Sequence, residues 1–240
     1  MSSLRLITKL TTSLLIACTL TSVASAEIAR VPGAPVTPTA PHFAQPPHHM
    51  RQPSYDEDVA PVLTRAAVRE ALLEARHRNL QLFRAYQKAG VFPSNTFEPT
   101  KLNVWRDADG HFCAAATIIR GNGLTELADR VADQNNFIRL ADVSQGPLMD
   151  FILTSGFTQD EIAMIQEPFD PVTRPSVRPV DPNEPSIVDA RLRAAETARL
   201  RVKYRQVERA LVKNEKRNLD VAVDRLMKHP DLAWKIASAE

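Results

Sequence analysis

Residues 187–228 form a stretch of 42 residues without a single glycine or proline. Both residue types disfavour helix interiors, glycine through backbone entropy and proline through its missing N–H group. Their absence over so long a stretch predicts a long C-terminal helix over 187–240, with an interruption at Pro230. The segment 187–240 holds 13 basic and 8 acidic residues, so it carries a net charge of +5.

The 18 prolines are concentrated in two other segments. Proline-rich segments favour extended, exposed chain because proline cannot donate a backbone hydrogen bond. We therefore predict a disordered Pro/His-rich linker over 27–60 and a Pro-rich hinge over 168–186. Residues 61–167, between them, are predicted to form the globular core. With 15 basic and 20 acidic residues, the segment 27–186 has a net charge of −5, opposite in sign to the C-terminal segment.

The first half of the core predicts a helix followed by a β-hairpin. Apolar residues at a spacing of three and four predict a helix over 61–89, and Gly90 ends it. Two apolar stretches within 101–119 flank Asp109-Gly110, a dipeptide favoured in two-residue hairpin turns. Asp107 and Asp109 resemble part of a calcium loop, but the remaining oxygen ligands of such a loop are missing. We therefore interpret the segment as a turn.

The second half of the core predicts further short helices. Apolar periodicity indicates helices over 124–140 and 148–153. Thr158 and Glu161 match the capping box that starts a helix. The predicted fold class is therefore α+β and mostly helical, with a small helix–β-hairpin–helix core, Pro-rich linkers and a long C-terminal basic helix.

Several enzyme classes are excluded by missing motifs. The chain has only 7 glycines, and it contains no Gly-x-Gly-x-x-Gly, Gly-Lys-Ser/Thr, His-Glu-x-x-His, Cys-x-x-Cys or Gly-x-Ser-x-Gly sequence. These patterns mark dinucleotide, phosphate, zinc, redox and serine-nucleophile sites. We therefore expect no cofactor and favour a non-enzymatic function.

The N-terminus predicts export from the cytoplasm. Residues 1–26 combine two early basic residues, a short apolar run and the small-residue sequence Ala24-Ser25-Ala26, as a cleavable signal peptide does. An alternative is lipidation of Cys18, because Leu15-Ile16-Ala17-Cys18 resembles a bacterial lipobox. We expect a periplasmic or secreted protein, attached to a membrane only if Cys18 is acylated.

Three interpretations of the C-terminal helix remain open. Leu200, Tyr204, Val207 and Leu211 follow the 4-3-4 spacing of a coiled coil, which favours packing on a protein partner, on a second copy through 187–228, or on the chain's own core. The helix also suits an envelope polyanion, whereas nucleic acid is not expected for an exported protein. The third interpretation is a solvated surface helix in which Glu208 and Glu215 make local ion pairs. The basic residues that would contact a polyanion are Arg191, Arg193, Arg199, Arg201, Lys203, Arg205 and Arg209.

Cys113 is the one candidate nucleophile beyond the predicted signal peptide. In the predicted hairpin, His111 lies on the same face as Cys113 and Arg106 lies opposite it, so Arg106 could lower the thiol pKa and His111 could accept the proton. Against this hypothesis, Cys113 lies in an apolar, alanine-rich run, which is typical of a buried cysteine.

The predicted linker holds one candidate metal site. His42, His48, His49 and Met50 offer imidazole and thioether ligands that suit copper, nickel or zinc. A disordered segment must lose conformational entropy to close around an ion, so the alternative is a polar linker that happens to contain histidine. On this sequence we expect an exported envelope protein that acts through contacts, with thiol chemistry and metal binding as alternatives.

Overall fold

A 25-residue helix, α1 (Arg65–Ala89), extends along the fold. Its first turn is capped by Thr64, whose side-chain oxygen accepts a hydrogen bond from the backbone N–H of Ala67. Its last turn ends at Gly90, which adopts the left-handed conformation that glycine tolerates best. The helix predicted over 61–89 is thus present, with its start four residues later.

The computed structural model describes residues 62–174 and 187–238. The predicted signal peptide, the linker over 27–60 and residues 175–186 of the hinge lie outside these ranges. The described residues are mostly helical, as predicted, and they contain no sheet. After α1 come α2 (Ala114–Gly121), α3 (Thr125–Gln134), the 3₁₀ helix η1 (Leu140–Asp142), α4 (Pro147–Thr154), α5 (Gln159–Ile165), α6 (Ala190–Lys213), α7 (Glu215–Leu226) and α8 (Pro230–Ala237).

The predicted β-hairpin is reduced to a turn followed by a helix. A single antiparallel bridge joins Arg106 to Phe112 around the turn. The chain then enters α2, so the strand predicted over 112–119 is wrong. The reason is local, because the Sγ of Cys113 accepts the N–H of Ala116 at 3.4 Å and so caps a run of alanines with high helix propensity.

The capping box predicted at the start of α5 is confirmed. The Thr158 side chain accepts the backbone N–H of Glu161, and the Glu161 carboxylate accepts the backbone N–H of Thr158. The two reciprocal bonds satisfy donors that the first helical turn leaves without partners.

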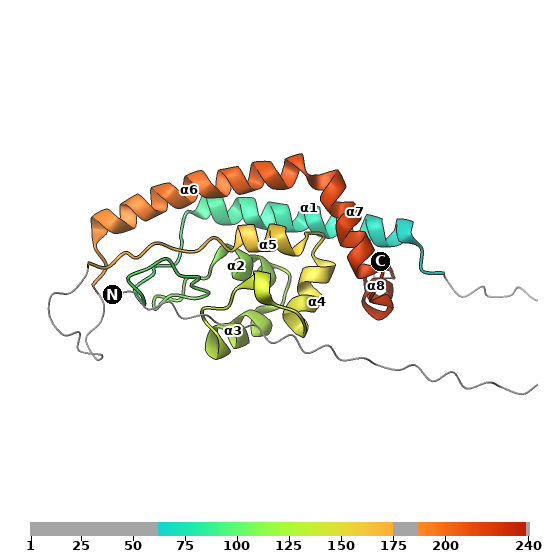
Figure 1. Ribbon diagram of the computed structural model, residues 1–240, viewed down its shortest axis with the longest axis horizontal. Helices are drawn as coiled ribbons and strands as arrows, with labels where there is room; N and C mark the ends of the chain where they lie inside the picture. Colours follow the sequence, from blue (N-terminus) through green and yellow to red (C-terminus); the bar gives the residue numbers. More distant parts are fainter. Residues whose placement is uncertain (1–61, 175–186, 239–240) are drawn as a thin grey trace, which may run out of the picture. The chain divides into compact units, whose positions relative to one another are not determined.

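The predicted C-terminal helix is divided into three. α6 ends at Lys213, Asn214 leaves the helical conformation, and α7 continues in a new direction (Figure 1). A buried arginine accounts for part of this break, because the Nη2 of Arg76 donates a 2.7 Å hydrogen bond to the carbonyl oxygen of Leu211. α8 begins at Pro230, which suits a first helical position.

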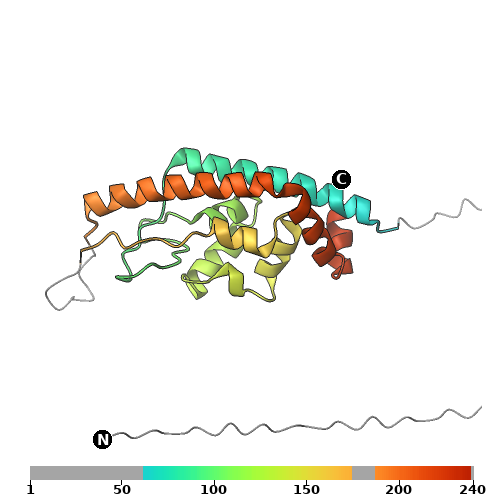
Figure 2. The same ribbon diagram turned by 45° about the horizontal axis from the view of Figure 1, so that its top comes forward.

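α6 lies alongside α1, and the two helices run in opposite directions (Figures 1 and 2). The ring of Tyr204 contacts those of Phe83, Tyr86 and Phe92, with centroids 5.5–5.6 Å apart. Leu200, nearly three turns into α6, is also fully buried in the same hydrophobic core. The C-terminal helix therefore packs on the core of its own chain, which is one of the alternatives that its apolar spacing left open.

A buried ion pair connects three of the helices. The Arg76 guanidinium in α1 donates to both carboxylate oxygens of Glu161 in α5, at 2.7 and 2.8 Å, and both side chains are 1% exposed. Asn218 in α7 donates to the same carboxylate at 2.9 Å. The guanidinium also bonds the carbonyl oxygen of Gly156, where any Cβ would lie 2.1 Å from the backbone oxygen of Leu72.

Candidate interaction surface on the C-terminal helices

The basic residues on the inward flanks of α6 are held by the core. Arg199 contacts Glu167 at 2.6 Å, Glu196 at 2.7 Å and Asp170 at 3.0 Å. These hydrogen bonds, led by the one to Glu196, raise the pKa of the Arg199 guanidinium. Arg193 donates to the backbone oxygens of Phe92 and Pro93. This part of α6 fixes two irregular segments of the chain.

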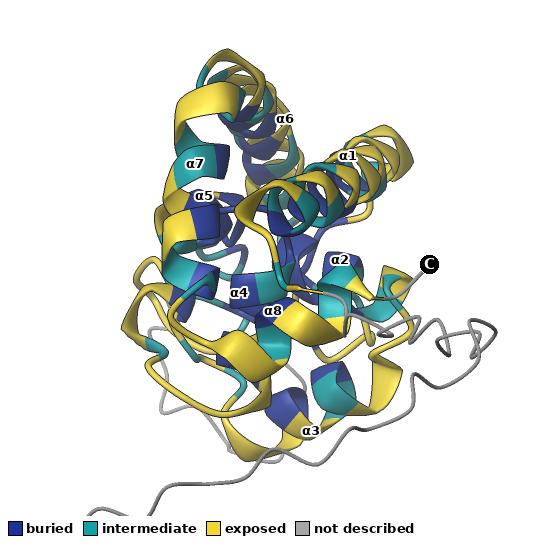
Figure 3. Ribbon diagram, turned by 90° about the vertical axis from the view of Figure 1, so that its right-hand side faces the viewer, coloured by how far each residue is buried: buried dark blue, intermediate teal, exposed yellow. Residues whose placement is uncertain are grey.

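The exposed sides of α6 and of the start of α7 carry a different set of basic residues. One of them, Arg201, reaches Gly90 at the end of α1, where a Cβ would lie 3.1 Å from its Nη2. All seven are exposed, and none lies within ion-pair distance of a carboxylate among residues 62–174 and 187–238. Figure 3 shows the same division, with buried positions on the inner side of α6 and exposed positions on its outer side. We call this set the basic face: Arg191, Arg201, Arg205, Arg209, Lys213, Lys216 and Arg217.

Four members of the basic face follow each other at intervals of four residues: Arg201, Arg205, Arg209 and Lys213. Side chains at this spacing are neighbours on a helix, and like charges there destabilise it by about 0.2–0.5 kcal/mol per pair. Glu208, the acidic residue within this stretch, is turned toward α1 and bonds Arg84 at 2.7 Å. The cations of the basic face therefore have no carboxylate partner within the described structure.

A groove of about 530 Å³ borders α6 beside the basic face. Its three cations are Lys101, Arg199 and Lys203, and each pairs with Glu167 or Asp170 at 2.6–3.5 Å. The charges of the groove are thus already matched, in contrast to those of the basic face.

The sequence pattern locates the basic residues of α6 only in part. Arg193 stands seven positions before Leu200, and seven residues are close to two helical turns. Its position on the buried side could therefore have been inferred from the apolar seam. The predicted basic surface did not include Lys213, Lys216 and Arg217. The same periodicity nevertheless places Lys213 in line with Arg209.

The proposed thiol site is not assembled. Cys113 is fully buried, and burial raises the pKa of its thiol from 9.0 to about 12. Arg106 pairs with Asp133 at 2.7 Å, and the Nδ1 of His111 lies 3.2 Å from Asp107. Each of the three predicted residues thus has a different partner, and the structure uses Cys113 as a helix cap.

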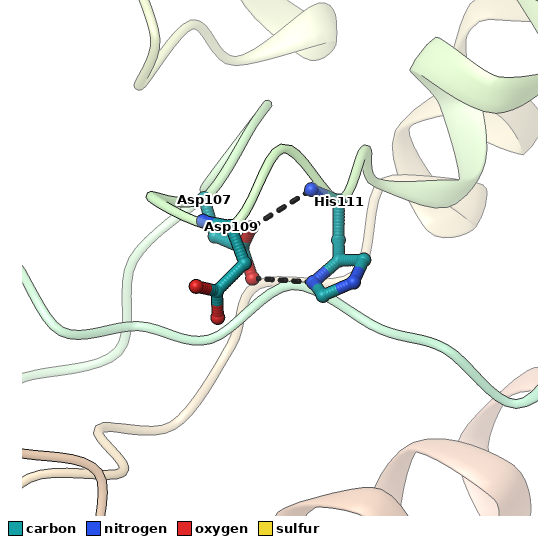
Figure 4. A group of neighbouring side chains, drawn as sticks. All are labelled: Asp107, Asp109 and His111. Carbon is teal, nitrogen blue, oxygen red and sulfur yellow. Dashed lines mark hydrogen bonds and ion pairs between the residues drawn. The ribbon is translucent and has the colours of Figure 1, made fainter.

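Asp107, Asp109 and His111 form the one group in the described residues whose side chains could jointly hold a metal ion (Figure 4). The buried Asp107 carboxylate already accepts the backbone N–H groups of Ser94, Asp109 and His111, and it also contacts the His111 ring. With both oxygens occupied, Asp107 organises a turn. A turn, as predicted for this segment, explains the hydrogen bonds of Asp107 without a metal ion.

The remaining predicted sites fall outside the described ranges. These are the lipidation candidate Cys18 and the metal candidates His42, His48, His49 and Met50. Within the described ranges, no helix combines the length and the apolar character needed to cross a bilayer. No protein-family model, curated protein or solved structure matches this chain.

Proposed function

We propose that this is an exported, non-enzymatic protein that binds an acidic partner protein through the basic face. One observation carries the proposal: seven exposed cations follow each other along α6 and the start of α7, and no carboxylate in the described structure lies within ion-pair distance of them. Export is inferred from residues 1–26, as described above.

The mutual repulsion of the cations on the basic face supports a binding role. Cations four residues apart repel each other, so the isolated helix is less stable than one with mixed charges. An acidic partner relieves that repulsion and is attracted to the surface over a distance set by the ionic strength. A surface helix without a binding role would be expected to mix both signs of charge on its exposed side.

A protein fits this surface better than a phosphate-rich polymer does. Ala195, Ala198, Val202 and Val212 lie on the same outer side as the arginines, and the two valines are 48% and 49% exposed. A partner protein can bury this apolar area while its carboxylates meet the guanidinium groups. A polyanion can use only the charges.

Self-association through the apolar seam is a poorer fit. Leu200, Tyr204, Val207 and Leu211 are at most 4% exposed, because they pack on the chain's own core. A coiled coil through this seam would require α6 to leave that core. The proposed contact uses the opposite side of the helix and leaves the core intact.

The proposal is tested with a synthetic amphipathic helical peptide that carries glutamate on one side and leucine or alanine on the other. We expect Arg205→Gln/Arg209→Gln/Lys213→Gln to weaken peptide binding at least tenfold at 0.15 M salt. The control is Arg130→Gln/Lys228→Gln/Lys235→Gln, which removes the same charge at exposed positions elsewhere. It should change binding less than twofold.

Two results would overturn the proposal. One is equal binding by the basic-face variant and the control. The other is tighter binding of inorganic polyphosphate than of the amphipathic peptide at equal anionic charge, which would define a polyanion site instead of a protein contact. Fluorescence anisotropy with labelled ligands measures both.

A further inference from the structure

A second cavity lies between α4, α5 and α7, away from the charged groove. It has a volume of about 180 Å³. Most of its wall is apolar and comes from Ile152, Leu153, Phe157, Val221 and Ala222. A purely apolar cavity of about 150 Å³ is large enough for a benzene ring. The cavity therefore suits a small ring or a short aliphatic chain.

Arg225 supplies the one cationic group in the wall of this cavity. Its Nη2 donates to the side-chain oxygen of Gln159 at 2.8 Å and to the sulfur of Met149 at 3.4 Å. Both acceptors are neutral, and no carboxylate in the described structure pairs with this half-buried guanidinium. The Nε and Nη1 donors have no partner there, although guanidinium groups favour carboxylates.

The groove beside α6 and this cavity differ in how their cations are paired. In the groove, every cation is matched by a carboxylate of the chain itself. In the cavity, the guanidinium is combined with apolar walls, and the one carboxylate of the wall, Asp160, does not pair with it. Thr158 adds a hydroxyl group, whose oxygen accepts the N–H of Glu161 and whose proton has no acceptor among the described residues.

We infer that this cavity binds a small apolar monocarboxylate of the size of benzoate. The ring or chain contacts the apolar walls, and the carboxylate accepts hydrogen bonds from Arg225 and from the Thr158 hydroxyl. Asp160, an exposed residue of the same cavity, disfavours ligands with a second negative charge. The site is independent of the basic face, so either proposal can fail alone.

Benzoate and benzamide provide a matched test, because they share a shape and differ in charge. In NMR titrations of the ¹⁵N-labelled chain, benzoate should bind at least tenfold more tightly than benzamide. Arg225→Met should abolish that preference while benzamide binding persists, which also shows that the cavity is intact. Arg130→Met, at an exposed position on α3, should leave the preference unchanged.

Two further variants make the inference specific. Val221→Trp should fill the cavity and block both ligands, and its dispersed spectrum would show that the chain still folds. Asp160→Asn should strengthen benzoate binding by removing a like charge. The inference is overturned if benzoate does not bind, if benzoate and benzamide bind equally, or if Arg225→Met retains the preference.

Discussion

Arg76 and Arg209 carry the same charge on packed helices, but their surroundings are opposite. Arg76 is 1% exposed and donates to Gly156, Glu161 and Leu211. Arg209 is exposed, and its one hydrogen bond goes to the backbone oxygen of Arg205. The first arginine is used to join elements distant in sequence, whereas the second has no counter-ion in the described structure. Burial and pairing thus separate a structural charge from one available to a partner.

The largest predicted effect concerns the buried charge. Arg76→Met should lower the free energy of unfolding by about 3–5 kcal/mol, because Glu161 remains buried without its cation. Urea denaturation followed by circular dichroism measures the change. Arg76→Met/Glu161→Leu should recover part of the loss, since it removes both charges. A decrease below about 0.5 kcal/mol for Arg76→Met would contradict the assigned role.

The ion pair also shows what the sequence could not predict. α1 and the start of α5 follow from local patterns, because helical periodicity and capping residues act over a few positions. Arg76 and Glu161 are separated by 85 residues, so no local pattern connects them. The capping box was predicted, but the second role of its glutamate depends on α1 and α7.

The failed hairpin has a related cause. The turn is present, but its central residues are Ala108 and Asp109, because the N–H of Gly110 donates to the carbonyl oxygen of Asp107. Gly110 follows it with φ +81°, so the predicted two-residue turn at Asp109-Gly110 is not formed. The apolar run after it was ambiguous, because short alanine-rich segments fit a buried helix as well as a strand. The Cys113 cap and the packing of α2 on α1 and α3 decide in favour of the helix. The predicted arrangement of Arg106, His111 and Cys113 required the strand, and without it each of them has a different partner.

The candidate surface was only partly foreseeable. The apolar seam of α6 followed from its spacing, and positions opposite a seam must face outward if the seam is buried. The sequence left open whether the seam packs on the same chain. That packing determines which arginines remain exposed to a partner. The Arg225 cavity depends on three helices meeting, so no single segment predicts it.

A second prediction concerns the uncharged interior beneath α6. Burial raises the pKa of the Cys113 thiol to about 12, and it also raises the pKa values of Tyr86 and Tyr204. Above pH 9 the unfolded chain loses the thiol proton while the folded chain retains it, so stability falls as pH rises. For one group the fall is about 1.4 kcal/mol per pH unit, or about 2–3 kcal/mol between pH 9 and 11.

Urea denaturation at several pH values measures this fall. Between pH 9 and 11, the free energy of unfolding of Cys113→Ala should fall less steeply with pH than that of the unmodified chain. The difference in slope should correspond to the release of about one proton, whatever the stability of the variant at pH 7. The thiol should also resist a thiol-specific reagent at pH 8 until the chain is unfolded. Identical slopes for the two chains, or rapid reaction of Cys113 in the folded state, would show that the thiol is accessible.

The smallest predicted effect concerns Arg209, the exposed arginine that was compared with Arg76. Arg209→Glu replaces two repulsive contacts, with Arg205 and Lys213, by two attractive ones, and it should raise the free energy of unfolding by about 1 kcal/mol at low salt. The gain should disappear in 1 M NaCl, where charges on the surface are screened. Arg130→Glu on α3 is the control with opposite sign, because it creates a repulsion with Glu126, four residues earlier. If Arg209→Glu instead lowers stability, the cations of the basic face do not oppose one another in the free protein, and the energetic reason for assigning them to a partner is lost.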